Sequence, residues 1–171
     1  MIRAGLLDQL ELLGWQVNCP ERLPSYEHLQ PADGDSAETR HPKLKNVDFV
    51  SKVTQVVHSK VKKACKQGHL ALTLGGDHSL GIATVSAAIA AYPNLGIIWV
   101  DAHADINTPE TTESGNLHGC PVSFLMGLGS PVKAFSWLKP TLKRDRIVYI
   151  GLRDVDAGNY YLQHLYNPIF W

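Results

Sequence analysis

Two aspartates and a histidine alternate directly after an apolar run and could together bind a divalent metal ion. The run over residues 95–100 predicts a strand, and Asp101, His103 and Asp105 follow it at a spacing of two. In a continued strand, successive side chains point to opposite faces, so these three would lie on one side. Neighbouring carboxylates are costly to desolvate unless a cation offsets their charge. Oxygen and imidazole ligands in this mixture favour an ion such as Mn, Fe, Co or Ni.

A second segment brings another histidine toward the same place. Residues 70–74 predict a strand, and Gly75 and Gly76 would let the chain turn sharply as it leaves that strand. His78 would then lie at the carboxyl end of the strand, where open α/β sheets bind their ligands. If the two strands are parallel neighbours, the candidate metal ligands are His78, Asp101, His103 and Asp105. The three cysteines are isolated from one another, which argues against a structural zinc site.

The surrounding sequence predicts alternating strands and helices that would deliver these groups to one edge of a sheet. Apolar periodicity predicts helices over 2–13, 46–67, 79–91 and 121–126, with a last one from about 157. Strands are expected over 70–74, 96–100 and 146–150, and a short one at 15–18. Asn46 is expected to cap its helix, and residues 19–45 predict a long surface loop. The order predicts an α/β fold of three layers, α/β/α, with a mostly parallel sheet covered by helices on both faces.

The composition fits one globular domain and excludes several classes of partner. The chain has 171 residues, and its 16 basic and 16 acidic residues cancel, so net charge favours neither nucleic acid nor an anionic membrane. No apolar run reaches the ~18 residues of a membrane-spanning helix. Asp8 and Glu11 interrupt the first apolar stretch, which argues against a secretory signal. The cysteines are far apart and odd in number, which predicts free thiols and a cytoplasmic location.

Four segments together resemble the signature segments of the arginase family, in the ureohydrolase superfamily. They are Gly-Gly-Asp-His-Ser-Leu at 75–80, Val-Asp-Ala-His-Ala-Asp-Ile-Asn at 100–107, Ser-Gly-Asn-Leu-His-Gly at 114–119 and Gly-Leu-Arg-Asp-Val-Asp at 151–156. The Asp-x-His-x-Asp run is typical of the superfamily, and the third segment favours arginase over agmatinase or formiminoglutamase. The similarity runs from about residue 3 to about residue 164. It implies a single partial arginase domain over 1–171, with a fold of the arginase and deacetylase type.

The resemblance implies a binuclear manganese site that hydrolyses L-arginine to L-ornithine and urea. His78, Asp101 and Asp105 match the ligands of one Mn²⁺ ion. Asp101 and His103 match ligands of the second, so that Asp101 bridges the two ions. Two such ions lower the pKa of a shared water, and the resulting hydroxide attacks the guanidinium carbon. His118 matches the catalytic proton shuttle of the family, a role that suits an imidazole near neutral pH.

Further positions match residues that bind the amino-acid end of the substrate in arginases. The positions that bind the α-carboxylate are Asn107, Thr112, Ser114 and Asn116. Asp156 matches the position that binds the α-amino group, and Asp154 matches a second acidic position nearby. Asn159 stands where the family often has a glutamate, which removes one negative charge near the substrate ammonium. L-Arginine is therefore the expected small-molecule partner, and the resemblance also allows a homo-oligomer.

The chain departs from the arginase pattern in ways that concern activity more than fold. It lacks the later Asp-x-Asp segment that completes both metal sites and the glutamate that pairs with the guanidinium, and residues 166–171 no longer resemble the family. We therefore expect a truncated domain with an incomplete sheet, whose isolated chain has little or no ureohydrolase activity. One alternative is an inactive fragment that acts at most as a partner of full-length subunits. Another is a ureohydrolase for a different guanidino substrate, such as agmatine.

Overall fold

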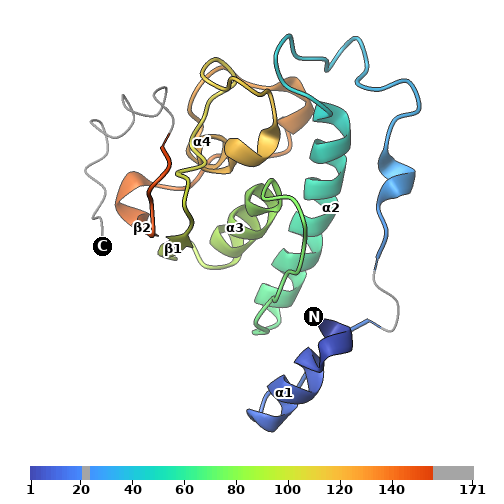
Figure 1. The fold of residues 1–171 in the computed structure, drawn as a ribbon, viewed down its shortest axis with the longest axis vertical. Helices are drawn as coiled ribbons and strands as arrows, with labels where there is room; N and C mark the ends of the chain where they lie inside the picture. Colours follow the sequence, from blue (N-terminus) through green and yellow to red (C-terminus); the bar gives the residue numbers. More distant parts are fainter. Residues whose placement is uncertain (21–23, 156–171) are drawn as a thin grey trace.

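Helices packed against a small parallel sheet form the body of the molecule (Figure 1). The structure is a computed structural model, and it describes residues 1–20 and 24–155. Its longer elements are α1 (Leu6–Leu12), α2 (Val47–Lys66), α3 (Leu80–Ala91), β1 (Ile97–Val100), α4 (Pro121–Met126) and β2 (Ile147–Ile150). Short 3-10 helices span Ile2–Ala4, Glu27–Leu29, Leu117–Gly119, Lys133–Phe135 and Arg144–Arg146. The predicted α/β class is therefore confirmed for the part of the chain that is described.

The sheet consists of β1 and β2, which pair in parallel with Ile97 opposite Ile147. Both strands match the predicted ranges to within one residue. Trp99 and Tyr149 point to the same face and are buried against apolar side chains of α3 and α4. The other face has no helix over it in the described residues, and Ile98 is 70% exposed there. The prediction of helices on both faces thus holds for one face only within the described chain.

The helices α2 and α3 pack along each other (Figure 1). Valines 57 and 61 of α2 meet Ala83 and Ala87 of α3, whose small side chains allow the two backbones to approach closely. Asn46 takes the N-cap position as predicted, but its side chain makes no capping hydrogen bond and its φ is 53°. Instead, the first turn of α2 donates the Asp48 N–H to Asp35 Oδ1 at 2.9 Å. The cap therefore comes from a residue distant in sequence, which no local pattern indicates.

Two predicted strands do not form. Residues 15–18 and 70–74 carry no regular secondary structure, and Leu70, Leu72 and Leu74 are exposed. A strand exists only through hydrogen bonds to a neighbour, and within the described residues neither segment lies in a ladder. The sequence therefore identified segments that are suited to a sheet but that have no strand beside them among the described residues.

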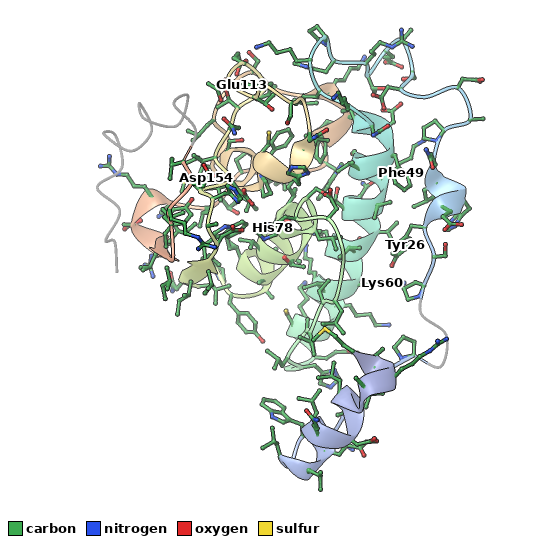
Figure 2. The ribbon with its side chains drawn as sticks, in the orientation of Figure 1. Tyr26, Phe49, Lys60, His78, Glu113 and Asp154 are labelled. Atoms are coloured by element: carbon green, nitrogen blue, oxygen red, sulfur yellow. The ribbon has the colours of Figure 1, made fainter. Side chains whose placement is uncertain are left out.

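The N-terminal region packs less tightly than the rest. The predicted helix over 2–13 is divided at Gly5, and no residue of α1 is buried. The described part of the predicted loop at 19–45 contains one 3-10 helix (Glu27–Leu29). It contacts α2 where Lys60 Nζ lies 5.4 Å from the centre of the Tyr26 ring (Figure 2). The helix predicted from about 157 lies outside the described residues. None of the described helices combines the length and apolarity needed to cross a membrane.

Candidate metal centre

Three predicted metal ligands converge where β1 ends and α3 is about to begin. One donor atom each from His78, Asp101 and Asp105 lies within 4.8 Å of the other two. The Nδ1 atom of His78 is 3.0 Å from Asp101 Oδ2 and 2.6 Å from Asp105 Oδ2. One imidazole and two carboxylates in this arrangement offer the mixed nitrogen and oxygen set that suits a divalent ion such as Mn²⁺. The predicted convergence of these three residues is therefore seen in the structure.

The way in which the aspartates converge differs from the prediction. β1 ends at Val100, so strand alternation does not extend through residues 101–105. The backbone bends instead, with the His103 N–H donating to Asp101 Oδ1 at 3.0 Å. Asp105 has a φ of 48°, in the left-handed region that aspartate enters more readily than most residues. A local turn, rather than a strand face, brings Asp105 beneath His78.

Buried polar contacts hold Asp105 in place. Its carbonyl accepts the Val122 N–H at 2.9 Å, which ties it to the start of α4. The Tyr149 hydroxyl of β2 donates to the Ala104 carbonyl at 2.9 Å, directly before Asp105. Burial raises the pKa of Tyr149, so the hydroxyl remains a donor. Tyr149 was not among the predicted site residues. The available signal was a tyrosine inside an apolar strand, since a buried hydroxyl needs a partner.

The electrostatics of the three-residue group fit a cation. Asp105 is 7% exposed, and within the described chain no donor is aligned on its Oδ2 for a hydrogen bond, although His78 Nδ1 is close. The Asp105 carboxylate raises the pKa of His78 above its ordinary value; burial opposes that rise, and the charges of Asp101 and Asp77 add to it. The His78 ring also stacks on Trp99, with centroids 4.9 Å apart. A buried carboxylate oxygen without an aligned donor is a place where a metal ion would relieve a desolvation cost.

His103 lies beside this group but outside it. Its Nδ1 is 3.4 Å from Asp101 Oδ1, and its Nε2 is 3.3 Å from Asp154 Oδ2. Asp154 reaches this position because its N–H and that of Arg153 both donate to the Ala102 carbonyl. Its side chain is 75% exposed. Figure 2 labels His78, at the turn that leads into α3, and Asp154, on the loop that follows β2. Asp154 thus contacts an imidazole in the described structure, and Asp156 lies outside the described residues.

His118 approaches the metal centre through Asp77. Its Nδ1 is 3.5 Å from Asp77 Oδ2, and both side chains are more than half exposed. Burial opposes ionisation of Asp77, but hydrogen bonds from Ser79 and the charge of His118 outweigh it and hold the pKa of this carboxyl below its usual value. The neighbouring Cys120 is fully buried, and burial with the charge of Asp105 raises its pKa to about 12. Cys120 is therefore a packing residue and not a reactive thiol.

The four predicted carboxylate-binding residues lie in the loop between β1 and α4, which is mostly buried. Several of their polar atoms shape the loop itself. Thr112 Oγ1 accepts the Gly115 N–H at 3.1 Å, and Ser114 Oγ accepts the Asn116 N–H at 3.2 Å. Asn107 is buried, and its Oδ1 accepts the Thr111 hydroxyl at 3.1 Å. These contacts give Asn107, Thr112 and Ser114 a part in the fold of the loop, beside any part in binding.

Two glycines of the signature segments allow close approaches of the chain. A Cβ on Gly115 would come 2.1 Å from the Lys43 carbonyl oxygen, and Gly115 also has a φ of 73°. A Cβ on Gly75 would come 2.1 Å from Leu80 Cδ1. Gly75 and Gly76 do not adopt positive φ, so the chain leaves residues 70–74 without a left-handed residue at either glycine. At Gly75 the missing side chain makes room for α3 instead.

The fold and the polar cluster together define a class: an α/β protein with a carboxylate and imidazole metal centre at the carboxyl end of a parallel strand. The comparisons with known proteins then narrow the class. Residues 7–169 match the arginase family. The chain is 51% identical to an arginase of Glaciozyma antarctica over 164 residues, and 44% identical to human arginase-1 over 164 residues. The chain belongs to the arginase family.

Solved structures agree with this assignment and set its extent. The structure superposes on the cold-adapted arginase of Glaciozyma antarctica with a TM-score of 0.80 and 49% identity, covering 99% of this chain and 55% of that one. The arginase of Bacillus caldovelox gives a TM-score of 0.79 at 29% identity, covering 99% of this chain and 56% of that one. In sequence, the match covers 92% of this chain and 46% of the Glaciozyma arginase. The chain therefore spans about half the length of the relatives that it matches.

Proposed function

We propose that this chain serves in the hydrolysis of L-arginine to L-ornithine and urea. It would supply most of the metal ligands of an arginase active site. The observation that carries the proposal is the group formed by His78, Asp101 and Asp105, whose donor atoms lie within 4.8 Å of one another. Their chemistry fits Mn²⁺, and His103 lies next to Asp101 in a position to serve a second ion. Bound Mn²⁺ would supply a water made acidic enough to attack the guanidinium carbon near neutral pH.

The chain's own residues have distinct parts in this proposal. Asp101 lies between the two imidazoles, 3.0 Å from His78 and 3.4 Å from His103, so it would hold metal together with each of these histidines. His118 would deliver the proton that the leaving amine needs. Asp77, 3.5 Å from His118 Nδ1, would fix the orientation of that ring. Asp105, whose left-handed backbone is fixed by its buried surroundings, would position the first ion.

Recognition of the amino-acid end of the substrate is assigned to the loop between β1 and α4 and to the segment after β2. We assign Asn107, Thr112, Ser114 and Asn116 to the α-carboxylate. We assign Asp156 to the α-amino group, with Asp154 as a second acidic residue nearby. The contact between Asp154 and His103 suggests that Asp154 also orients a metal ligand. Asn159, in place of an acidic residue, weakens the preference for a substrate ammonium. A homo-oligomer and a cytoplasmic location stay predictions.

The isolated chain is expected to have little or no activity. It spans about half the length of its relatives. By the family pattern it has three protein ligands for one ion (His78, Asp101 and Asp105) and two for the other (Asp101 and His103). A second candidate follows from the same observation: the chain acts as an inactive partner of complete arginase subunits. The two candidates differ in whether Mn²⁺ binding is retained, because an inactive partner does not need the metal.

Calorimetry with Mn²⁺ tests the proposal. The purified chain should bind manganese, and His78→Ala should weaken that binding strongly. His28→Ala is a matched control, because it removes an imidazole from the region before α2, far in sequence from the metal centre. Two ions at micromolar affinity would support an enzyme whose missing ligands come from water or a neighbour. Absence of Mn²⁺ binding would favour the inactive partner.

Urea release completes the test and addresses the substrate. Urea formation from L-arginine by the isolated chain, at a rate near that of a complete arginase, would contradict the expectation of low activity. If activity is found, L-arginine and agmatine should be compared under the same conditions. Agmatine lacks the α-carboxylate that the loop is proposed to bind, so arginine should be the better substrate. The reverse order would assign the chain to another ureohydrolase activity.

A further inference from the structure

One segment of the surface carries a sequence pattern that the metal centre does not use. Residues 130–133 read Ser-Pro-Val-Lys, and both the serine and the lysine are exposed. Proline has no N–H, so a serine followed by proline suits a kinase whose cleft offers no hydrogen-bond acceptor at that position. The lysine three residues after the serine adds a positive charge that an acidic patch of the same kinase can bind. The run Ser-Pro-x-Lys is the acceptor pattern of proline-directed protein kinases.

Ser130 is the only serine or threonine in the sequence that meets this pattern. The one other such residue followed by proline is Thr108, which is buried and has a threonine, not a basic residue, three positions later. Ser130 instead lies in an exposed turn between α4 and the 3-10 helix at Lys133–Phe135. A kinase could therefore bind the backbone around Ser130 without first opening a helix or a strand.

A contact between Ser130 and Glu110 joins this turn to the loop between β1 and α4. The Glu110 carboxylate accepts the Ser130 N–H at 2.9 Å, and hydrogen bonding by the Ser130 side chain is the largest effect that lowers the pKa of Glu110. Gly129 packs against the same carboxylate, since a Cβ there would come 2.6 Å from Glu110 Oε2. Glu110 lies between Asn107 and Thr112, two of the residues assigned to the substrate carboxylate. The turn at 127–131 therefore supports the loop at its exposed end.

The charges around this contact determine what a phosphate on Ser130 would do. Lys43 Nζ donates to the Glu110 carbonyl oxygen at 2.6 Å, and Lys133 Nζ forms an ion pair with Glu38. Both ammonium groups thus already have acceptors, whereas the group in contact with Ser130 is the Glu110 carboxylate. A phosphoserine carries a charge of about −1.5 to −2 at neutral pH and has lost its hydroxyl donor. Phosphorylation would therefore replace a hydrogen-bond donor beside Glu110 with a like charge.

We propose that Ser130 is a phosphorylation site for a proline-directed kinase, and that its phosphate separates the turn at 127–131 from Glu110 and loosens the loop between β1 and α4. In the reaction, Ser130 Oγ attacks the γ-phosphorus of ATP. A new O–P bond forms as the bond from that phosphorus to the bridging oxygen breaks, ADP leaves, and the hydroxyl proton passes to a base of the kinase. The site does not depend on catalysis by this chain.

Phosphate transfer tests the site. The folded chain is incubated with ATP and a cyclin-dependent kinase, which is proline-directed, and mass spectrometry locates the phosphate. Ser130 should be modified, Ser130→Ala should abolish that modification, and Lys133→Ala should slow it at least about tenfold because the kinase loses a charge to bind. Ser136→Ala is the matched control, since Ser136 is exposed but is followed by tryptophan; it should change nothing. Absence of phosphate on Ser130, while the kinase modifies a peptide of residues 126–137, would overturn the proposal.

Hydrogen exchange tests the effect of the phosphate on the loop. The Thr111 and Thr112 amides donate to the Thr108 carbonyl oxygen, at 3.2 and 3.0 Å, in the turn that contains Glu110. Phosphorylation of Ser130 should make these amides exchange at least about tenfold faster and leave the amides of α2 unchanged. In Glu110→Gln, which removes the like charge, the acceleration should be much smaller.

Two outcomes of the exchange experiment would overturn the proposed role of the phosphate. One is unchanged exchange of the loop in the phosphorylated chain. The other is an equal acceleration in phosphorylated wild type and phosphorylated Glu110→Gln, because the repulsion would then have no part in the effect. A phosphorylated chain with a loosened loop that binds no Mn²⁺ would uphold this site and count against the proposed function.

Discussion

Two segments support the metal centre, and they differ in how completely this chain secures them. The loop from Asp101 to α4 delivers Asp105 and is held by buried hydrogen bonds, including those of Tyr149 to Ala104 and of Val122 to Asp105. The segment at 70–76 delivers His78 and makes no backbone hydrogen bond within the described chain. Within the described chain, buried hydrogen bonds therefore fix the segment that delivers Asp105, and the segment that leads to His78 has no backbone hydrogen bonds of its own.

The largest effect on folding is expected at Gly115, in the loop from Asp101 to α4. Gly115→Ala places a Cβ 2.1 Å from the Lys43 carbonyl oxygen at a φ of 73°, which should cost about 3 kcal/mol in the free energy of unfolding. In the segment at 70–76, the Cβ that Gly76→Ala adds meets nothing within 4 Å. This substitution should change the free energy of unfolding by less than about 0.5 kcal/mol. Urea denaturation measures both variants. Equal losses at the two sites would remove the contrast between the segments.

Asp105→Asn should reduce Mn²⁺ affinity by about 100-fold, because a buried carboxylate ligand loses its charge. Isothermal calorimetry or the electron paramagnetic resonance signal of free Mn²⁺ can measure this change. Glu113→Gln makes the same change of charge at an exposed position of the same loop and should leave the affinity unaltered. A similar loss in both variants would mean that Mn²⁺ responds to overall charge and not to a defined ligand.

Removing the hydroxyl that supports the Asp105 turn should have an intermediate effect. Tyr149→Phe leaves the buried Ala104 carbonyl without its donor, at a cost of about 1.5 kcal/mol in unfolding free energy. Tyr92→Phe deletes a comparable hydrogen bond, to the Cys65 carbonyl, from a more exposed position, and should cost less. Thermal or urea unfolding of both variants tests the order. A larger loss for Tyr92→Phe would show that the support of the loop lies elsewhere.

The smallest effect is a pH dependence of stability that Glu110 causes, at an exposed position of the loop from Asp101 to α4. Its carboxylate accepts the Ser130 N–H at 2.9 Å; hydrogen bonding to Ser130, against a small effect of burial, lowers the pKa of Glu110 to about 2. The folded state therefore favours the ionised form, and the stabilisation is present above about pH 4.5 and is lost as the pH falls toward 2. Because the side chain is exposed and screened, the difference from Glu110→Gln should be about 1 kcal/mol at neutral pH.

Unfolding of wild type and Glu110→Gln between pH 2 and pH 6 measures that difference. The two stabilities should converge at the acid end of this range. Glu113→Gln, three residues further along, serves as the control and should follow the wild-type profile. A constant difference between wild type and Glu110→Gln at all pH values would mean that the substitution acts through packing and not through the carboxylate charge.

The sequence predicted features with local causes and missed features with distant ones. α4 spans Pro121–Met126 as predicted, because a proline at its first position and Gly127 after its end are local signals. Residues 70–74 have strand character in sequence but do not form one, because a strand needs a neighbour that local sequence does not specify. The cap of α2 by Asp35 likewise comes from a distant residue.

The same distinction between local and distant causes applies to the metal centre. The identities of His78, Asp101 and Asp105 as a group were predictable from residue type and motif, and the structure brings them together. The turn that brings them together was not predictable from the sequence, because it depends on the left-handed backbone of Asp105 and on the Tyr149 hydroxyl from β2. The roles of His118 and of the substrate-binding residues stay predictions, and Asp156 lies outside the described residues.

The backbone of Asp105 has a consequence for how such sites change during evolution. At a φ of 48°, aspartate and asparagine are tolerated better than glutamate, although glutamate carries the same charge. The geometry of the turn and the chemistry of a metal ligand therefore select the same residue for two separate reasons. A descendant that had lost its metal would still be under pressure to keep an aspartate or asparagine here. This position alone is thus a poor marker of retained catalysis, and His78 and Asp101, which carry no such backbone constraint, are better ones.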